Sequence, residues 1–510
     1  MNSSETRIHI LVSIAVLLTC TVLFSITPQY VLDEIAEGRA RSALKAADSL
    51  VKVNPSDPYS AYVHALALYE EGMYKEAADA AERSADRLAV IDPSNRKEVI
   101  SVHDYLRDSW KLLREFKKVE GRSFSLSYYN PKDSILAFEV FRVLDSAKVI
   151  IGRDLGYIPE DTVRVEIYPD KASFISVSTL TEDEVKRTGT IALCKFNRIM
   201  IISPRALLRG YKWRETLCHE YVHFVLHRMA GTRLPLWIHE AIARFEEVRF
   251  DGRTGGNLSQ SEKGLLSRAV RNNSLITFAR MYPSMAKLKN ATETGTAFAE
   301  VHLAMKLLHE KCGYPCVRTL IKTAISGGNT DSLISERYLF DFIKSMPVSA
   351  TSFADTSGPV FTEDGESEAG ENSYQKWVRL ADKLLKEKRS VAAIKELERA
   401  SVVAGGASSW VFTQMAVLYS DNGENEKALS ALNKAIDLFP DDCNAYFRRA
   451  RLNQKLGHVS AAADDARRAL EINPFHGEAR ELLLEALDPE VNREEYRREM
   501  RNGSYLYKLK

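Results

Sequence analysis

Two histidines and a glutamate stand within five positions of one another, in a spacing that suits metal chemistry. His219, Glu220 and His223 lie in the stretch from Trp213 to Gly231, whose pattern predicts a helix with a glycine stop. Residues four apart share one helix face, so both imidazoles can bind one Zn²⁺ at about 2.0–2.1 Å. Glu220, between them, would point toward a metal-bound water rather than toward the metal. We therefore expect a catalytic zinc centre here.

A third protein ligand is needed, because catalytic zinc takes three and leaves one position for water. His227 shares the helix face, but it lies about 12 Å along the axis from His219 and is better explained as a polar residue near the helix end. A second helix predicted from Leu234 to Glu246 can return a carboxylate, and Glu240 is the candidate. The adjacent His239 is rotated by about 100° on that helix, so only one of the two can face the ion. We expect Glu240.

Three further side chains have both a functional and an ordinary interpretation. Glu246 and Glu247 either orient a ligand histidine or lie on a solvated helix face. His302 either polarises a substrate carbonyl or is an ordinary surface or core histidine. The ordinary interpretation is preferred for all three.

The two predicted helices resemble a known family. His-Glu-x-x-His followed by Pro-x-Trp-Ile-x-Glu is similar to the thermolysin-like gluzincins, and specifically to short bacterial peptidase MA-like domains, over roughly Phe124 to Ile334. The resemblance implies an α+β zincin-like fold with Zn²⁺ as cofactor. It also implies the site roles: His219, His223 and Glu240 as metal ligands and Glu220 as catalytic base.

The chain departs from that family's pattern at two positions. Ala241 replaces the usual glycine after the ligand glutamate, which is a mild change for a helix. Phe298 falls where many relatives carry tyrosine, so the residue that would stabilise an oxyanion stays unassigned.

Small residues and prolines recur at a fixed period near the C-terminus. The pairs 34 residues apart are Gly423 and Gly457, Ala428 and Ala462, Ala435 and Ala469, and Pro440 and Pro474. This pattern resembles the tetratricopeptide repeat, a pair of helices that stacks on its neighbours. A third, less regular unit is expected from Tyr374 to Gly406, and a capping helix from Gly477 to Leu487. Residues 29–119 show the same helical pattern.

The rest of the chain divides by composition and periodicity. Strands are expected within Ser123–Tyr129, Thr162–Tyr168 and Ile191–Ile202, and a helix within Ser134–Leu155. The segment from Ser349 to Gln375 has six acidic residues and no lysine or arginine, which predicts a flexible linker. The predicted divisions are 1–28 anchor or signal, 29–119 repeat-like helices, 120–347 metallopeptidase-like domain, 348–373 acidic linker, 374–488 repeats with cap, and 489–510 tail.

An uncharged stretch near the N-terminus predicts a membrane anchor. Ile8 to Ile26 spans 19 residues, within the length of a spanning helix and beyond the apolar core of most cleaved signals. A single-pass protein with its bulk on the extracytoplasmic (periplasmic) side is expected. The alternatives are a secreted protein or a lipoprotein modified at Cys20.

Charge and cysteine content set limits on the function. Lys plus Arg is 70 and Asp plus Glu is 69, so no global basic field exists for nucleic acid, which is not expected as a partner. Six cysteines in 510 residues are too few for a disulfide scaffold. Cys218 is expected to be a small buried hydrophobe, whereas Cys312 and Cys316 either pack or form a local disulfide.

These observations support two main functions. The first is a membrane-anchored zinc metallopeptidase that hydrolyses peptide bonds, with the repeats recruiting a protein substrate or partner. The alternative is a repeat scaffold or assembly protein with an inactive or structural peptidase-like domain. An assembly protein without bound metal is a third possibility, but two histidines and a glutamate packed dry on one face would be costly without a cation.

Overall fold

The computed structural model describes residues 26–91, 96–178, 180–207, 209–282, 285, 288–346, 373–403 and 408–509. The chain forms two compact units, Met1–Trp110 and Lys111–Lys510.

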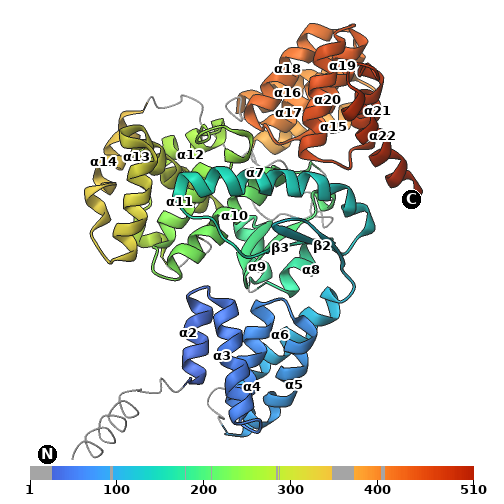
Figure 1. The fold of residues 1–510 in the computed structure, drawn as a ribbon. Coiled ribbons are helices and arrows are strands. Elements are labelled where there is room, and N and C mark those ends of the chain that lie inside the picture. Colours follow the sequence, from blue (N-terminus) through green and yellow to red (C-terminus); the bar gives the residue numbers. More distant parts are fainter. Residues whose placement is uncertain are drawn as a thin grey trace, which may run out of the picture. The chain divides into compact units, whose positions relative to one another are not determined.

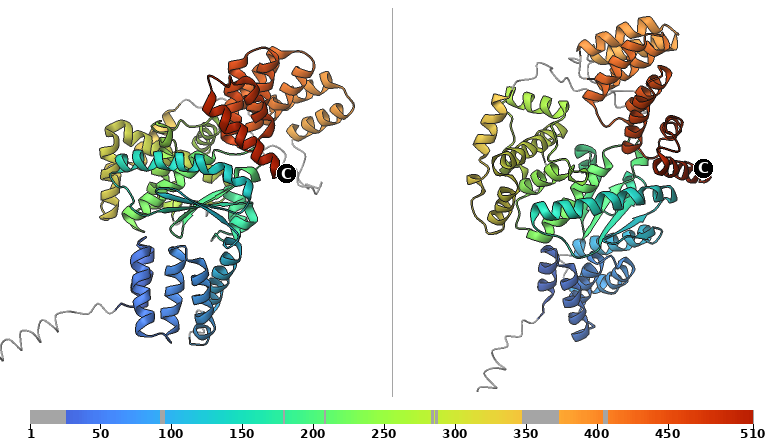
Figure 2. Two further views of the ribbon diagram at one scale, coloured as in Figure 1. Left: turned by 45° about the vertical axis from the view of Figure 1, so that its right-hand side comes forward. Right: turned by 45° about the horizontal axis from the view of Figure 1, so that its top comes forward.

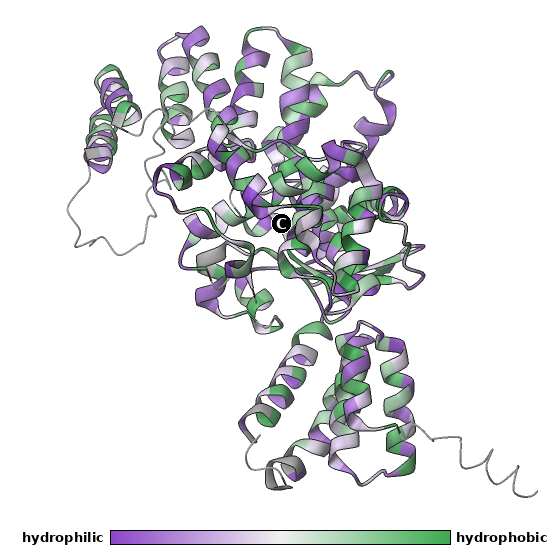
Figure 3. Ribbon diagram, turned by 90° about the vertical axis from the view of Figure 1, so that its left-hand side faces the viewer, coloured by the Kyte–Doolittle hydropathy of each residue, from purple (hydrophilic) through white to green (hydrophobic). Residues whose placement is uncertain are grey.

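The first unit consists of helices. They are α2 (Pro28–Ala36), α3 (Ala40–Val53), α4 (Pro58–Glu70), α5 (Tyr74–Ile91) and α6 (Arg96–Leu113), the last of which continues into the second unit (Figure 1). Small apolar side chains, among them Ala43, Ala47 and Ala67, are fully buried where α2, α3 and α4 meet. Small residues let neighbouring helix backbones approach closely, and each helix carries both hydrophobic and hydrophilic residues (Figure 3).

The second unit contains a five-stranded sheet in the order β1-β2-β3-β5-β4. The strands are β1 (Lys117–Glu120), β2 (Phe124–Tyr128), β3 (Val163–Tyr168), β4 (Ala192–Lys195) and β5 (Arg198–Ile202). The central three strands are parallel, while β1 and β4 pair antiparallel at the two edges. The stretch predicted as one strand, Ile191–Ile202, is a hairpin, because Phe196 and Asn197 both take positive φ in a two-residue turn.

The two faces of the sheet have different partners. Leu126, Val165 and Ile199 are fully or almost fully buried in one core with α7 (Ala137–Leu155) and α10 (Trp213–Ala230). The alternate residues point to the other face, where Tyr168 contacts Phe174 of α8 (Lys171–Ser176). The period-2 pattern of the strands therefore selects which face receives the long helices (Figures 1 and 2).

Further helices complete the unit around α10. They are α9 (Glu182–Thr188), α11 (Leu236–Glu246), α12 (Gln260–Arg271), α13 (Ala291–Ile325) and α14 (Glu336–Ser345), with short 3₁₀ turns at Pro131–Leu136, Pro204–Ala206, Arg249–Asp251, Phe278–Met281 and Thr330–Ser332. Helix α13 is broken at Cys312 and Gly313, where its φ and ψ angles leave the helical region. Cys312 and Cys316 are joined by a disulfide bond, which was one of the two arrangements expected for them.

The C-terminal repeats are helix pairs with alanine-rich contacts. Helices α15 (Ser373–Lys386) and α16 (Ser390–Val403), α17 (Ser409–Asp421) and α18 (Asn425–Leu438), and α19 (Cys443–Lys455) and α20 (Val459–Ile472) form the pairs, followed by α21 (Gly477–Ala486). The periodic Ala428, Ala435, Ala462 and Ala469 are all completely buried, which explains why the period is kept. The expected C-terminal tail contains one more helix, α22 (Arg493–Lys508).

The predicted fold class is wrong. It was a distinct α+β zincin-like peptidase domain between separate repeat regions, with a transmembrane helix. The described residues are mostly helical, the sheet has five strands of four to six residues, and this sheet shares one compact unit with the C-terminal repeats. The backbone N–H of Cys443 in α19 donates to the carbonyl of Arg209, and the Trp213 indole donates to the carbonyl of Glu471 in α20. Contacts between residues that distant in sequence could not be read from local periodicity.

No helix among the described residues is long and apolar enough to cross a membrane. This corrects the prediction of a single-pass membrane protein with an extracytoplasmic bulk. The anchor proposed at residues 8–26 lies outside the described residues except for its last position, as does most of the predicted acidic linker.

The turn before α10 yields a stability prediction. Gly210 has φ 67°, and an added Cβ would lie 2.7 Å from the carbonyl oxygen of Ile472. Gly189 has φ 69° and open space around it, so it is a matched control. We expect Gly189→Ala to cost about 1–2 kcal/mol from backbone conformation alone. Gly210→Ala should cost about 1–3 kcal/mol more through overpacking, measured as a larger drop in Tm. Equal Tm values would contradict this packing.

Candidate metal centre

Two helices that meet in the core position the candidate ligands. Most of α10 is buried, including Leu217, Tyr221 and Val225, which are completely inaccessible, so the face that carries the histidines has a fixed orientation. Helix α10 ends at Gly231 with positive φ, and α11 begins directly after Pro235. The short connection returns the chain against α10, as the sequence predicts for a helix pair around a metal.

Three ligand atoms converge between these helices. The Nε2 atoms of His219 and His223 are 3.1 Å apart, and each lies 3.5 Å from Oε2 of Glu240. Among the described residues, this trio is the group of histidine, cysteine and acidic side chains whose geometry suits a metal ion. The side chains are 14 to 17% exposed, so the centre is shielded but accessible.

The triangle has the dimensions of a tetrahedral zinc site. Ligands bound at about 2.0–2.1 Å in tetrahedral geometry are separated by about 3.3–3.4 Å, close to the observed 3.1 and 3.5 Å. Oε2 of Glu240 is buried and accepts no hydrogen bond. Two imidazole nitrogens and a carboxylate oxygen are also a donor set that Zn²⁺ prefers. The residues present therefore fit the metal, although binding itself stays a prediction.

The electrostatics of the metal-free trio show how strongly these groups interact. Burial alone would lower the pKa of His219, but the adjacent carboxylates of Glu240 and Glu247 outweigh it and raise that pKa to about 10. Burial would raise the pKa of Glu240, but the charges of His223 and His219 hold it well below its usual range. A divalent cation at the trio would therefore compete with the proton of His219.

Glu220, the predicted base, lies beside the trio and not in it. Its side chain is buried, and desolvation raises its pKa despite the two nearby histidines and a hydrogen bond from the backbone of Cys194 on β4. A carboxylate with raised proton affinity beside a metal position is suited to hold a proton taken from a metal-bound water.

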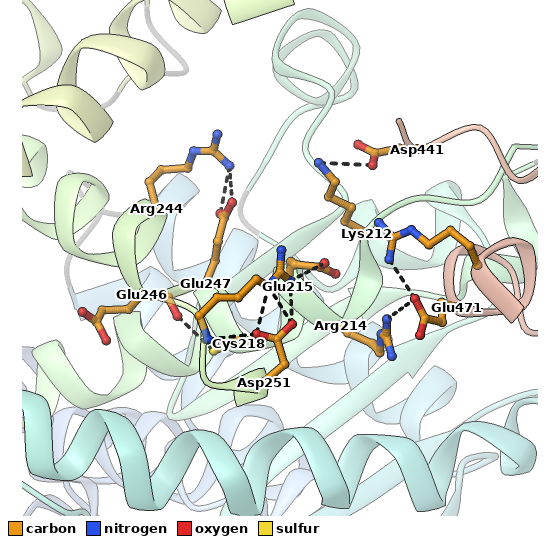
Figure 4. A network of polar contacts seen from close by, with 12 residues as sticks. Lys212, Arg214, Glu215, Cys218, Arg244, Glu246, Glu247, Asp251, Asp441 and Glu471 are labelled. Atoms are coloured by element: carbon orange, nitrogen blue, oxygen red, sulfur yellow. Dashed lines mark hydrogen bonds and ion pairs between the residues drawn. The ribbon is translucent and has the colours of Figure 1, made fainter. Parts of the chain in front are cut away.

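A second layer of charges orients His219. Nδ1 of His219 lies 3.5 Å from Oε2 of Glu247. Oε1 of the same carboxylate accepts a hydrogen bond from Arg244 at 2.6 Å (Figure 4). Arg244 in turn lies 2.5 Å from Glu262 on α12. The solvated-face interpretation of Glu247 is therefore wrong, because its carboxylate faces the ligand histidine. Arg244 was overlooked, although the i, i+4, i+7 spacing of Glu240, Arg244 and Glu247 places them on one helix face.

Glu246 also differs from its expected solvated position, since it is completely buried. Burial raises its pKa to about 8, which leaves the carboxyl largely neutral at pH 7. The Sγ–H of Cys218, which is buried as expected, lies 3.5 Å from the Glu246 carbonyl (Figure 4).

The other histidines lie outside the trio. His302 is buried, with its Nε2 2.8 Å from the Gly256 carbonyl oxygen and its Nδ1 without a hydrogen-bond partner, and its ordinary interpretation stays a prediction. The ring of His239 lies 5.7 Å from that of His223, and burial lowers the pKa of His239 to about 3. His227 falls in the last turn of α10. Phe298 packs, partly buried, against the core.

Comparison with known proteins identifies the two helical ends of the chain. A tetratricopeptide-repeat family model matches residues 31–95 and 413–477. Both segments are tetratricopeptide repeats. The predicted repeats are therefore confirmed. Repeats of this kind bind protein partners along the extended surface that stacking creates.

Solved structures show likenesses to the repeats. The first such domain of Spaghetti (RPAP3), bound to the HSP90 peptide SRMEEVD, is 24% identical and covers 22% of this chain and 90% of its own, with a TM-score of 0.22. MamA is 18% identical over 27% of this chain and 82% of its own, with a TM-score of 0.25. The P58(IPK) repeat domain is 14% identical over 90% of this chain and 95% of its own, with a TM-score of 0.23. Scores this low do not show a shared overall fold. No curated protein sequence matches the chain.

These comparisons correct the leading functional prediction. The family model matches tetratricopeptide repeats, and no described helix is long and apolar enough to span a membrane. The membrane-anchored metallopeptidase that recruits its substrate through the repeats is therefore replaced as the leading function by its alternative, the repeat scaffold.

The geometry of the trio predicts a metal-content experiment. We expect about one zinc per chain in the full-length protein and a loss of at least tenfold in zinc affinity in His223→Ala, because one of three ligands is removed. His227→Ala, on the same helix but outside the trio, is the matched control and should keep its zinc. Elemental analysis after dialysis measures both. Equal zinc in all three proteins would place the metal elsewhere.

Proposed function

We propose that this protein is a tetratricopeptide-repeat scaffold whose central region carries a zinc-binding module. The observation that supports the scaffold is the repeat match at both ends of the chain. The convergence of His219, His223 and Glu240 supports the module. The resemblance to peptidase MA-like domains is consistent with a metal-stabilised element of that kind.

The partner-binding surface proposed for the C-terminal repeats lies on α19. Arg448, Arg451 and Lys455 are exposed and occupy one face of this helix at i, i+3 and i+7. No carboxylate of the described residues pairs with any of the three, whereas the neighbouring Arg449 is held 2.6 Å from Asp465. Unpaired cations on one exposed helix face favour an acidic peptide as the partner.

A binding experiment tests the scaffold. The acidic peptide SRMEEVD, the ligand in the RPAP3 structure, is a suitable fluorescent probe, titrated at two salt concentrations. We expect Arg448→Glu/Arg451→Glu to weaken its binding about tenfold or more, since like charges at an interface repel. Arg501→Glu/Lys508→Glu on α22 changes the net charge equally and should bind as wild type does. Equal binding by both variants would remove the α19 surface from the proposal.

The zinc module gives the central region a second role. When bound, the metal would stabilise the contact between α10 and α11 by joining ligands from both helices. His219, His223 and Glu240 would hold it, and Glu247 would fix the tautomer and orientation of His219 through Nδ1.

Hydrolysis at this centre is a second candidate function, favoured by one observation: Glu220 is buried beside the trio with a raised pKa. A bound zinc supplies a water of lowered pKa. Glu220 would accept the proton of that water and return it to the leaving group. Phe298 leaves this reaction without a hydroxyl donor at the position expected from the family resemblance, which is why the scaffold is placed first.

The hydrolytic candidate has its own test. Glu220→Gln keeps the volume and removes the base, so we expect unchanged zinc content and at least a hundredfold lower hydrolysis of a quenched fluorescent peptide library, the usual size of a general-base contribution. Wild type without detectable turnover would leave the module as a structural zinc site. Equal turnover in both proteins would exclude Glu220 as the base.

A further inference from the structure

The start of α10, the helix that carries both histidine ligands, is stabilised from outside. Its N-cap residue, Lys212, makes no side-chain capping hydrogen bond. The first N–H groups of a helix need acceptors or nearby negative charge, because they carry the positive end of the helix dipole. The groups that fill this role belong partly to the last repeat pair, α19 and α20.

Ends of the repeat helices α19 and α20 pair with the start of α10 and the turn before it. The N–H of Cys443, the first residue of α19, donates at 3.2 Å to the carbonyl of Arg209 in the turn before α10. In the other direction, the indole of Trp213, the first residue of α10, donates at 3.0 Å to the carbonyl of Glu471 near the end of α20. An unpaired donor of one helix and an unpaired acceptor of another are thus both removed by this contact.

Ion pairs reinforce the contact at the same place. Arg214 lies 2.9 Å from Glu471 and 3.1 Å from Glu139 of α7, with its side chain 12% exposed. Lys212 lies 3.2 Å from Asp441, which precedes α19 (Figure 4). These two carboxylates of the repeats neutralise the cations at the positive end of α10, where unpaired positive charge is unfavourable.

We propose that Trp213 and Arg214 are positioning residues of the metal centre, and that the α19–α20 repeat holds the ligand helix through them. This inference rests on the proposed zinc module. Trp213 is six residues before His219, about 9 Å along a helix whose buried faces keep it rigid. A shift at its first turn is therefore transmitted to His219 and His223 relative to Glu240 on α11.

The proposal has a thermodynamic consequence. If the repeat contact favours the metal-competent position of α10, metal must strengthen the repeat contact by the same factor. Metal bound at the trio should then slow amide deuterium exchange in α20, which has no ligand of its own. A purely structural role for Trp213 and Arg214 does not produce this effect.

The test uses the full chain and four variants. They are Arg214→Gln, Glu471→Gln, the double variant that combines these two, and Trp213→Phe. Zinc affinity is measured by competition with a chromogenic chelator. We expect each single variant to bind zinc threefold to tenfold more weakly, which is about the net value of one hydrogen bond or buried ion pair. The double variant should lose no more zinc affinity than the weaker-binding single variant, because Arg214→Gln and Glu471→Gln remove the same ion pair. Arg142→Gln is the matched control, since Arg142 pairs with the same Glu139 but does not pair with Glu471.

Cobalt distinguishes misplacement of the helix from misfolding. At saturating Co²⁺, a variant whose ligand helix is repositioned should still bind the ion, but its visible absorption bands should differ from those of wild type. A misfolded variant should bind no cobalt. Trp213→Phe then takes the place of that variant in the comparison. In wild type, metal should slow exchange in α20, and in the double variant it should not. Zinc affinities within twofold of wild type in all interface variants overturn the positioning proposal alone. A wild-type protein that binds no metal overturns both this proposal and the zinc module.

Discussion

The arrangement of this protein depends on the convergence of charged groups between α10 and α11. Two imidazoles, the carboxylate of Glu240 and the carboxylates of Glu220 and Glu247 lie within a largely buried volume. Burying such groups is unfavourable unless opposite charge and hydrogen bonds compensate. The surrounding elements provide this compensation, through the rigid buried face of α10, the turn at Gly231 and Pro235, and the Arg244 guanidinium behind Glu247.

The same helix is also where the central region meets the repeats. One end of α10 is closed by Gly231, and the other is held by α19 and α20 through main-chain and ionic contacts. Repeats usually stack only on one another, so their terminal pair leaves helix ends to be satisfied. Here the ends of α19 and α20 pair with the turn before α10 and with its first residue, which helps to explain why Lys111–Lys510 forms one compact unit.

Two kinds of surface coexist in that unit and suit different ligands. The α19 face offers cations for an acidic protein segment, whereas the trio offers nitrogen and oxygen donors for a metal. Both lie on or next to helices that meet at the turn from Arg209 to Trp213. Under the proposed zinc module, this connection would relate what the repeats bind to the metal held at the trio.

The sequence by itself determined the local elements. The 34-residue period predicted the repeats, the alternation predicted β2 and β3, and the i, i+4 histidines with Glu240 predicted the trio that the structure brings together, because each of these depends on neighbours along the chain. Glu247, placed by sequence on a solvated surface, and the contact of Trp213 with Glu471 were decided by tertiary structure. Both depend on which distant helices pack together, and packing buries and pairs side chains that local periodicity treats as equivalent. For the same reason the expected separate α+β domain was wrong, since domain boundaries follow contacts across space and not composition along the chain.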